Sequence, residues 1–83
     1  MKQTEQKPLH ALALNESGVV SAVAPECRLR SRLRSLGLCE GVRVTAVLRS
    51  PFGDPVAYEA DGVLLALRKR DCEGITVQTE GGL

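Results

Sequence analysis

Apolar and polar residues alternate most clearly in the middle of the chain. The apolar positions there are 42, 44, 46 and 48, and Arg43, Thr45 and Arg49 lie between or beside them. A period of two is typical of a strand with one buried face. Shorter apolar runs at 19–24, 56–60, 63–68 and 75–78 predict further strands. Asp61-Gly62 separates two of these runs and predicts a tight hairpin turn.

One segment has a helical period instead. It is marked by a stripe of leucines at spacings of four and three, Leu29, Leu33 and Leu36. This spacing predicts a helix over about 25–36. Pro25 suits its first turn, Gly37 supplies a left-handed stop, and Leu38 follows where it can fold back on the last turn.

The order of elements is a strand, a helix and then four short strands at close spacing. This order predicts a mainly β protein, a small barrel of about five to six strands with one short helix. The 83 residues suffice for a single small core. We expect residues 8–78 to form the domain, with flexible polar tails at 1–7 and 79–83.

Charge and composition exclude several classes of protein. Eleven basic residues nearly cancel ten acidic ones, and Phe52 and Tyr58 are the only aromatic residues. Such a chain has neither the positive electrostatic field nor the aromatic stacking surface of a nucleic-acid-binding protein. None of its apolar runs approaches the ~18 residues of a membrane span. Three widely spaced cysteines without a CxxC do not form a disulfide framework. Their free thiols predict a cytoplasmic protein.

The segment "SPFGDPV", residues 50–56, joins two predicted strands. Pro51 and Pro55 suit strand ends, Gly53 permits unusual backbone angles, and Asp54 can accept hydrogen bonds from the nearby backbone. Turn chemistry does not explain Phe52. Its ring either folds back over the mouth of the barrel or anchors a small interface.

The run "RLRSRLR" places four arginines on the predicted helix: Arg28, Arg30, Arg32 and Arg34. The simplest interpretation is a solvated face whose side-chain stems cover apolar surface. A second is an electrostatic rim that steers an acidic partner, and a third, weakened by the near-zero net charge, is a groove-binding helix. Leu38 either caps the helix or faces a partner.

Candidate chemistry is sparse. With His10 as the only histidine, no nucleophile has an evident base, so we predict that the chain is not an enzyme. His10, Cys27 and Cys39 are weak candidates for metal ligands, because closely spaced Cys/His pairs are missing. We expect Cys27 to be exposed among arginines and Cys72 to be a small core residue. No cofactor is predicted as required, and weak or transient binding of a divalent transition metal stays open.

Three segments together carry a resemblance to a known family: "RLRSLGLCEGVRV" (32–44), "RSPFGDPVAYEADG" (49–62) and "LALRKRDCEGITV" (65–77). In order and spacing they resemble the ferrous iron transport protein A family, FeoA. The resemblance implies an SH3-like barrel and a small cytosolic accessory protein of bacterial ferrous iron uptake. The implied partner is FeoB, a membrane permease with a cytosolic GTPase domain, on which this protein would dock without entering the membrane.

The expected docking surface combines the helix, the turn after it and the 51–55 loop. Its candidate residues are Arg28, Arg32, Leu36, Leu38, Phe52, Asp54 and Pro55. Similar domains also occur in iron-responsive transcription regulators. The alternative function is therefore an SH3-like regulatory module that binds metal, a peptide or nucleic acid. The sequence leaves the oligomeric state open.

Overall fold

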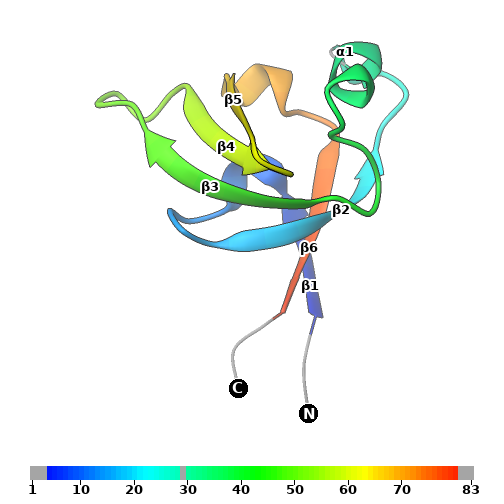
Figure 1. The fold of residues 1–83 in the computed structure, drawn as a ribbon, viewed down its shortest axis with the longest axis horizontal. Coiled ribbons are helices and arrows are strands. Elements are labelled where there is room, and N and C mark those ends of the chain that lie inside the picture. Colours follow the sequence, from blue (N-terminus) through cyan, green and yellow to red (C-terminus); the bar gives the residue numbers. More distant parts are fainter. Residues whose placement is uncertain (1–3, 29, 81–83) are drawn as a thin grey trace.

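The chain forms one strongly bent antiparallel sheet with a short helix over one end (Figure 1). The structure is a computed structural model that describes residues 4–28 and 30–80. In chain order its elements are β1 Thr4–Pro8, the 3-10 helix η1 Leu9–Ala11, β2 Ser17–Val23, α1 Arg30–Ser35, β3 Arg43–Arg49, β4 Val56–Ala60, β5 Val63–Leu67, the 3-10 helix η2 Lys69–Asp71 and β6 Ile75–Glu80. The strands follow the spatial order β1-β6-β2-β3-β4-β5. This mainly β fold with six strands and one helix confirms the predicted class.

The two ends of the described chain lie side by side. β1 pairs with β6 from Thr4 opposite Glu80 to Pro8 opposite Thr76. The prediction of flexible tails is therefore wrong for residues 4–7 and 79–80, and positions 1–3 and 81–83 lie outside the described residues. The sequence did not predict β1, because its side chains are mostly exposed and show no apolar alternation. Backbone hydrogen bonds to a distant strand leave no such pattern.

A bulge in β3 changes the face on which one leucine lies. Ala46 pairs with Tyr58, but Leu48 pairs with Ala57, so the register shifts between the two. Val44 and Ala46 are fully buried as the alternation predicts, whereas Leu48 is 64% exposed. A bulge adds one residue to a strand and so reverses the alternation beyond it. The predicted inward orientation of Leu48 is therefore wrong.

The helix ends where the sequence predicts but begins later. Gly37 has φ +91°, and the N–H groups of Gly37 and Leu38 donate to the carbonyls of Arg34 and Leu33 at 3.1 and 2.8 Å. These two bonds form a Schellman motif. Residues 25–28, predicted as the first turn, precede the helix instead. Directly before this segment, the N–H of Ala24 donates to Gly74 O at 2.8 Å, and this bond joins the chain here to the turn before β6.

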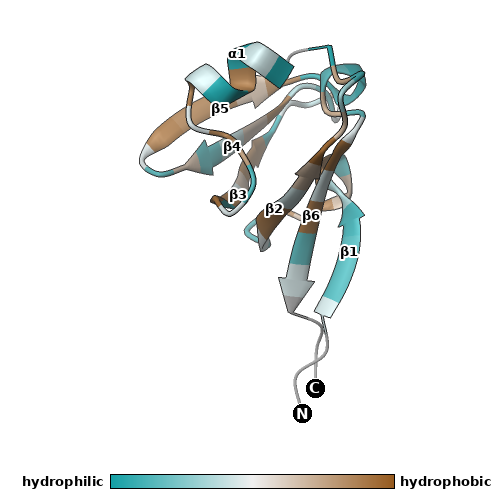
Figure 2. Cartoon of the chain, turned by 90° about the vertical axis from the view of Figure 1, so that its right-hand side faces the viewer, coloured by the Kyte–Doolittle hydropathy of each residue, from teal (hydrophilic) through white to brown (hydrophobic). Residues whose placement is uncertain are grey.

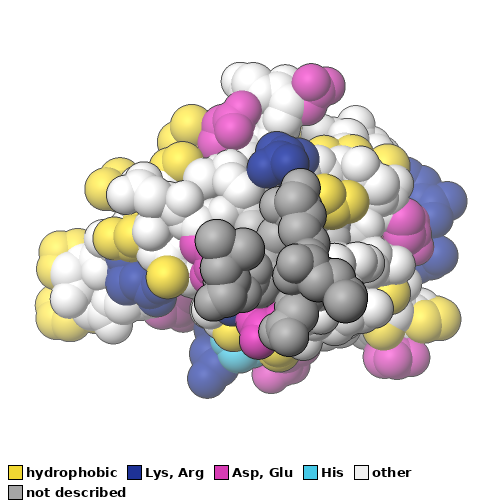
Figure 3. All heavy atoms as spheres, turned by 90° about the horizontal axis from the view of Figure 1, so that it is seen from below, with side chains coloured by type: hydrophobic (Ala, Val, Ile, Leu, Met, Phe, Trp, Pro, Cys, Tyr) yellow, Lys and Arg dark blue, Asp and Glu magenta, His cyan; other side chains and the backbone are white. Residues whose placement is uncertain are grey.

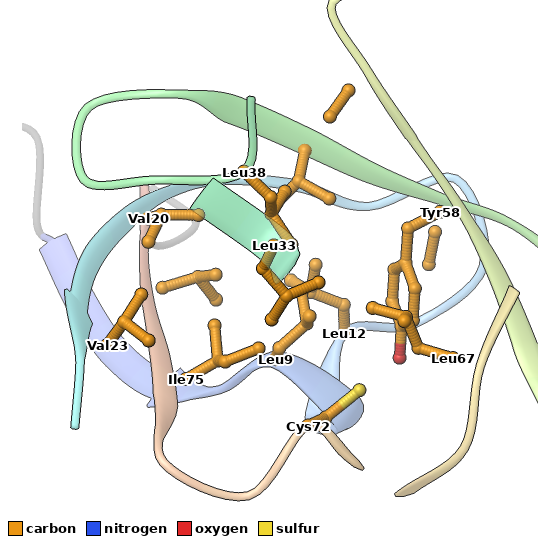
Figure 4. Packing of buried hydrophobic residues seen from close by; sticks show 14 of the residues in the cluster. Leu9, Leu12, Val20, Val23, Leu33, Leu38, Tyr58, Leu67, Cys72 and Ile75 are labelled. Carbon is orange, nitrogen blue, oxygen red and sulfur yellow. The ribbon is translucent and has the colours of Figure 1, made fainter. Parts of the chain in front are cut away.

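The core lies inside the bent sheet and beneath α1 (Figure 4). Leu33 and Leu38 enter it from the helix and the turn after it, each 1% exposed. Tyr58 is the largest buried side chain, and Cys72 is fully buried beside it, as predicted for this cysteine. Leu36 is 42% exposed, so the leucine stripe is buried only in part, and Leu29 lies outside the described residues.

The β4–β5 hairpin turns at Asp61 and Gly62, with φ of +52° and +81°. Positive φ at both central residues defines a type I′ turn, which the dipeptide predicts. The Glu59 carboxylate accepts a hydrogen bond from the Gly62 N–H at 2.8 Å and holds the turn. No helix within residues 4–28 and 30–80 has the length and apolar character needed to cross a membrane.

Candidate functional site

The loop between β3 and β4 is a compact turn. The N–H of Gly53 donates to Ser50 O at 2.8 Å, and that of Ser50 donates to Pro55 O at 3.2 Å. Gly53 has φ +86°, the left-handed conformation that favours glycine. The Asp54–Pro55 peptide is cis. These internal bonds give the loop one defined shape, as its turn-forming residues predict.

Asp54 joins this loop to a distant part of the chain. Its Oδ1 accepts a hydrogen bond from the backbone N–H of Lys69 at 2.8 Å, and Lys69 is the first residue of η2. We expected Asp54 to bond to the nearby backbone, so the expected partner was wrong. The observed bond fixes the β3–β4 loop to the segment that follows β5.

Phe52 lies at the tip of the loop and is 95% exposed. The first of the two expectations, a ring folded back over the barrel mouth, is therefore wrong, and the alternative of an outward-facing ring remains. Apolar side chains gather at the end of the molecule where this loop lies, at the left of Figure 3. A fully exposed aromatic ring on a fixed loop contributes little to the stability of the fold and is available for contact.

A hollow of about 240 Å³ lies beside the loop. Basic and acidic residues line it: His10 of η1, Arg49 of β3, Lys69 of η2 and Asp54 of the loop itself. An Arg49 guanidinium nitrogen donates to Leu12 O at 3.4 Å, which holds this side chain against η1. Within the described residues the only ion pair is Lys7–Glu16, so Arg49 and Lys69 have no carboxylate within 4 Å there. The hollow beside the Phe52 loop therefore holds two cationic residues against one carboxylate, an excess of positive charge.

The floor of the hollow is formed in part by Tyr58. Burial raises the pKa of the Tyr58 hydroxyl well above its usual range. Burial likewise raises the pKa of the neighbouring Cys72 thiol to about 12. Both groups are therefore neutral at physiological pH. Cys72 is an inert core thiol rather than a nucleophile, because the thiolate is the reactive form.

The helix presents a second surface, on the other side of the molecule. Arg32 of α1 is exposed, and so are Arg28 just before the helix and Leu36 just after it. Leu38 is buried in the core, so the possibility that it faces a partner is excluded. The β3–β4 loop and α1 lie at opposite ends of the view in Figure 1, whose longest axis spans 36 Å. The structure therefore divides the expected single docking surface into two.

The three weak candidates for metal ligands do not converge. His10 lines the hollow together with Arg49 and Lys69, Cys39 is half-buried in the turn after the helix, and Cys27 is buried. The expected exposure of Cys27 was wrong because α1 begins only at Arg30, which leaves the thiol against Asp71 O at 3.8 Å. In the part of the chain that the structure describes, no three His, Cys, Asp or Glu residues could share a metal ion.

Sequence reasoning missed the basic hollow. His10, Arg49 and Lys69 are far apart in the chain, and each is an ordinary surface residue by itself. Only the sheet topology, together with the Asp54–Lys69 bond, brings η1, the end of β3 and η2 together. The sequence contains one weak signal for this convergence, an acidic "GDP" turn at 53–55 and a basic "LRKR" segment at 67–70. Such short motifs are too common to predict a contact.

The FeoA domain model matches residues 7–79 of this chain. The chain belongs to the FeoA family. This membership links it to ferrous iron transport and to a family of small SH3-like domains that is not known as an enzyme family. A comparison with curated proteins finds no significant match.

Solved structures agree with the family. The solution structure of the FeoA protein from Chlorobium tepidum is 36% identical, with a TM-score of 0.80 over 88% of this chain and 70% of that one. A zinc complex of Stenotrophomonas maltophilia FeoA, described as a prokaryotic SH3 domain protein, is 28% identical, with a TM-score of 0.72 over 94% of each chain. A manganese-dependent transcriptional repressor has the same fold, at 17% identity and a TM-score of 0.78 over 93% of this chain and 43% of the repressor.

Proposed function

We propose that this FeoA protein is a non-enzymatic accessory protein of bacterial ferrous iron uptake that docks on the FeoB permease and modulates it. Docking occurs on the cytosolic part of the permease, with Phe52 as the anchor. The observation that carries the proposal is the 95% exposure of Phe52 on a hydrogen-bonded loop. Interface energy concentrates in a few aromatic and arginine side chains, and a loop of fixed shape loses little entropy on binding.

The surroundings of Phe52 indicate what the partner surface is like. Arg49 and Lys69 lie behind the loop, and Pro55 and Asp54 complete its outer turn. A matching surface is an apolar pocket for the ring with carboxylates at its rim. Opposite charges at the rim speed association and set orientation more than they add affinity. The contact is small and transient, below about 1,200 Å².

The helix surface of Arg28, Arg32 and Leu36 is a separate candidate contact. A small interface cannot include both ends of a molecule that is 36 Å long. We place the primary contact at the loop, because Leu36 is 42% exposed and Phe52 is 95% exposed. The arginines on the helix then form a solvated face.

Iron is the cargo of the system in this proposal, and the protein needs no bound metal to act. His10, the only imidazole, lines a hollow in which Arg49 and Lys69 outnumber the single carboxylate of Asp54, and this excess of positive charge opposes the binding of a further cation. Any binding of a transition metal is therefore weak or transient.

The test is a titration of the isotope-labelled protein with the soluble cytosolic domain of the cognate permease, with and without guanine nucleotide. We expect amide shifts to concentrate at residues 50–55 and at η2. Phe52→Ala should weaken binding about tenfold or more, since hot-spot truncation costs roughly 2 kcal/mol. Leu36→Ala is the control, because Leu36 is an exposed leucine directly after α1, at the other end of the molecule from the loop. Binding that survives Phe52→Ala unchanged would refute the role of the loop.

The alternative is a regulatory module of iron-responsive transcription. It is supported by a likeness of fold to the manganese-dependent repressor, at an identity that carries no function across. Acidic and basic side chains are interspersed on the face in Figure 3, without the uniform basic surface that nucleic acid selects. Tight, salt-sensitive retardation of DNA by the protein would favour this alternative over docking on the permease.

A further inference from the structure

One edge of the sheet is protected and the other is not. Among the described residues, β1 and β5 are the two outermost strands. β1, "TEQKP", carries charges and a proline, which are the usual devices against pairing with another strand. β5, "VLLAL", carries neither. Figure 2 shows the contrast, with β1 in teal and β5 in brown at opposite sides of the sheet.

The hairpin turn determines which backbone groups of β5 point outward. In a two-residue hairpin the flanking residues, here Ala60 and Val63, form a hydrogen-bonded pair. Bonding to β4 then alternates along the strand and uses positions 63, 65 and 67. The N–H and C=O groups of Leu64 and Ala66 therefore point away from β4 to the free edge. They offer two donors and two acceptors to another strand.

Exposed apolar side chains accompany this edge. Leu64 is 63% exposed and Val63 is 42% exposed. A hollow of about 350 Å³ lies between β5 and α1; Arg32, Leu33 and Leu36 line it on the helix side, and Asp71 lines it after β5. The hollow is lined by β5 from Leu64 to Leu67, so open space adjoins most of this strand on the side of the helix. Another strand can therefore approach β5, with room beside it for apolar side chains.

The charges that flank β5 indicate which strand fits. Asp61 precedes β5, and Arg68 and Lys69 follow it. When two copies of β5 pair antiparallel, Asp61 of each copy lies near Arg68 and Lys69 of the other. The two-fold symmetry gives two such contacts between opposite charges. We infer that β5 is the interface of a symmetric dimer, in which the occupant of the free edge is β5 of a second copy of this chain.

The outward groups also determine the register. Leu64 of each copy lies opposite Ala66 of the other, which forms four backbone hydrogen bonds, and Leu65 faces its own symmetry mate on the two-fold axis. The two sheets become one continuous sheet. Because only five residues of each strand pair, the contact falls in the small class below about 1,200 Å². The dimer is therefore weak, with a dissociation constant of roughly 10 µM to 1 mM.

The first test is sedimentation equilibrium of the full chain from about 10 µM to 2 mM, a range that brackets this dissociation constant. We expect the mean mass to rise from monomer to dimer. Leu64→Lys should weaken dimerisation tenfold or more, because it places a charge on each side of the contact. Leu48→Lys is the matched control: Leu48 is 64% exposed, and its strand β3 lies inside the sheet rather than at the β5 edge. A monomer over the whole range, or equal effects of both variants, overturns the inference.

Two further variants test the backbone and the register. Ala66→Pro removes an N–H that no bond within the chain uses, so dimerisation should be lost with the fold retained in circular dichroism. In a Cys39→Ser background, Leu65→Cys should form a disulfide-linked dimer with oxidised glutathione, since facing residues without mutual hydrogen bonds lie about 4.5 Å apart. Val63→Cys should not, because its mate lies roughly 13 Å away. Cross-linking at 63 and not at 65 contradicts the register.

Discussion

At the scale of single residues, the most consequential burial is that of Cys72. A thiol is a small apolar group while it stays protonated, and the sheet encloses this one completely. Its neighbour Tyr58 supplies the other ionisable group of the core. Ionisation of either group would place a charge where water cannot solvate it. Both groups therefore stay protonated at neutral pH, and their ionisation at high pH destabilises the folded state.

This burial predicts a loss of stability at alkaline pH. The pKa of Cys72 is about 12 in the folded state against an ordinary value of 9.0. Because the pKa is higher in the folded state, the thiol ionises first in the unfolded chain. Its contribution to the free energy of unfolding is therefore complete below pH 9 and is lost as the pH rises from 9 toward 12. Between pH 8 and 10 this thiol alone lowers the free energy of unfolding by about 1 kcal/mol.

Urea unfolding at pH 8 and pH 10 measures the effect. The Cys72→Ala variant, which has no thiol at this position, should lose about 1 kcal/mol less than the parent protein over the same interval. Tyr58 is present in both proteins, and burial, the main cause of its raised pKa, remains without the thiol, so its contribution is nearly equal in the two. Equal losses in the two proteins would mean that the thiol titrates normally and is not enclosed as described.

At the scale of elements, the end of α1 is where sequence and structure agree best. The six-residue helix stops at a Schellman motif that directs Leu38 back into the core beside Leu33. Gly37, with φ +91° and no heavy atom within 4 Å of an added Cβ, is needed for its backbone conformation alone.

Gly37→Ala should therefore destabilise the protein by about 1 kcal/mol, the cost of a left-handed conformation for a residue with a Cβ. Gly37→Asn should cost less, because asparagine tolerates this conformation better than other residues with side chains. Thermal or urea unfolding of the two variants gives the comparison. Equal stabilities of the alanine variant and the parent protein would contradict the motif.

The elements that the sequence predicted are those whose signal is local. The Asp61-Gly62 turn and β4 lie where the alternation and the dipeptide place them. The bulge that turns Leu48 outward depends on the opposing strand, and so does β1, which has almost no buried side chains. In the candidate site, the turn at 51–55 was predictable from its residue types. The convergence of His10 with Arg49 was not, because it depends on packing between distant segments.

At the scale of the whole molecule, the sheet has one edge built to resist pairing and one open edge. β1 is the protected edge strand, and it in turn covers the outer edge of β6. β6 is the last strand of the chain and carries the core residues Ile75 and Val77. The polar segment Thr4–Pro8 is therefore part of the sheet and protects a strand of the core.

Deletion of residues 1–7 tests this role. It removes most of β1, exposes the backbone of β6 along its outer edge, and should lower the free energy of unfolding by roughly 2 kcal/mol or more, at about 0.5–1 kcal/mol for each ladder bond lost. The shortened protein should also aggregate sooner on heating, because β6 becomes an unprotected edge.

Lys7→Ala is the control for the deletion. Lys7 Nζ lies 3.1 Å from Glu16 Oε2 in a partly exposed ion pair, which contributes at most about 1 kcal/mol. The substitution removes this pair and leaves the β1–β6 ladder in place. Thermal unfolding followed by light scattering should therefore separate the two variants, with early aggregation in the deletion variant alone. If the deletion is no more harmful than Lys7→Ala, β1 adds side-chain contacts only, and residues 1–7 behave as the polar tail that their composition first indicated.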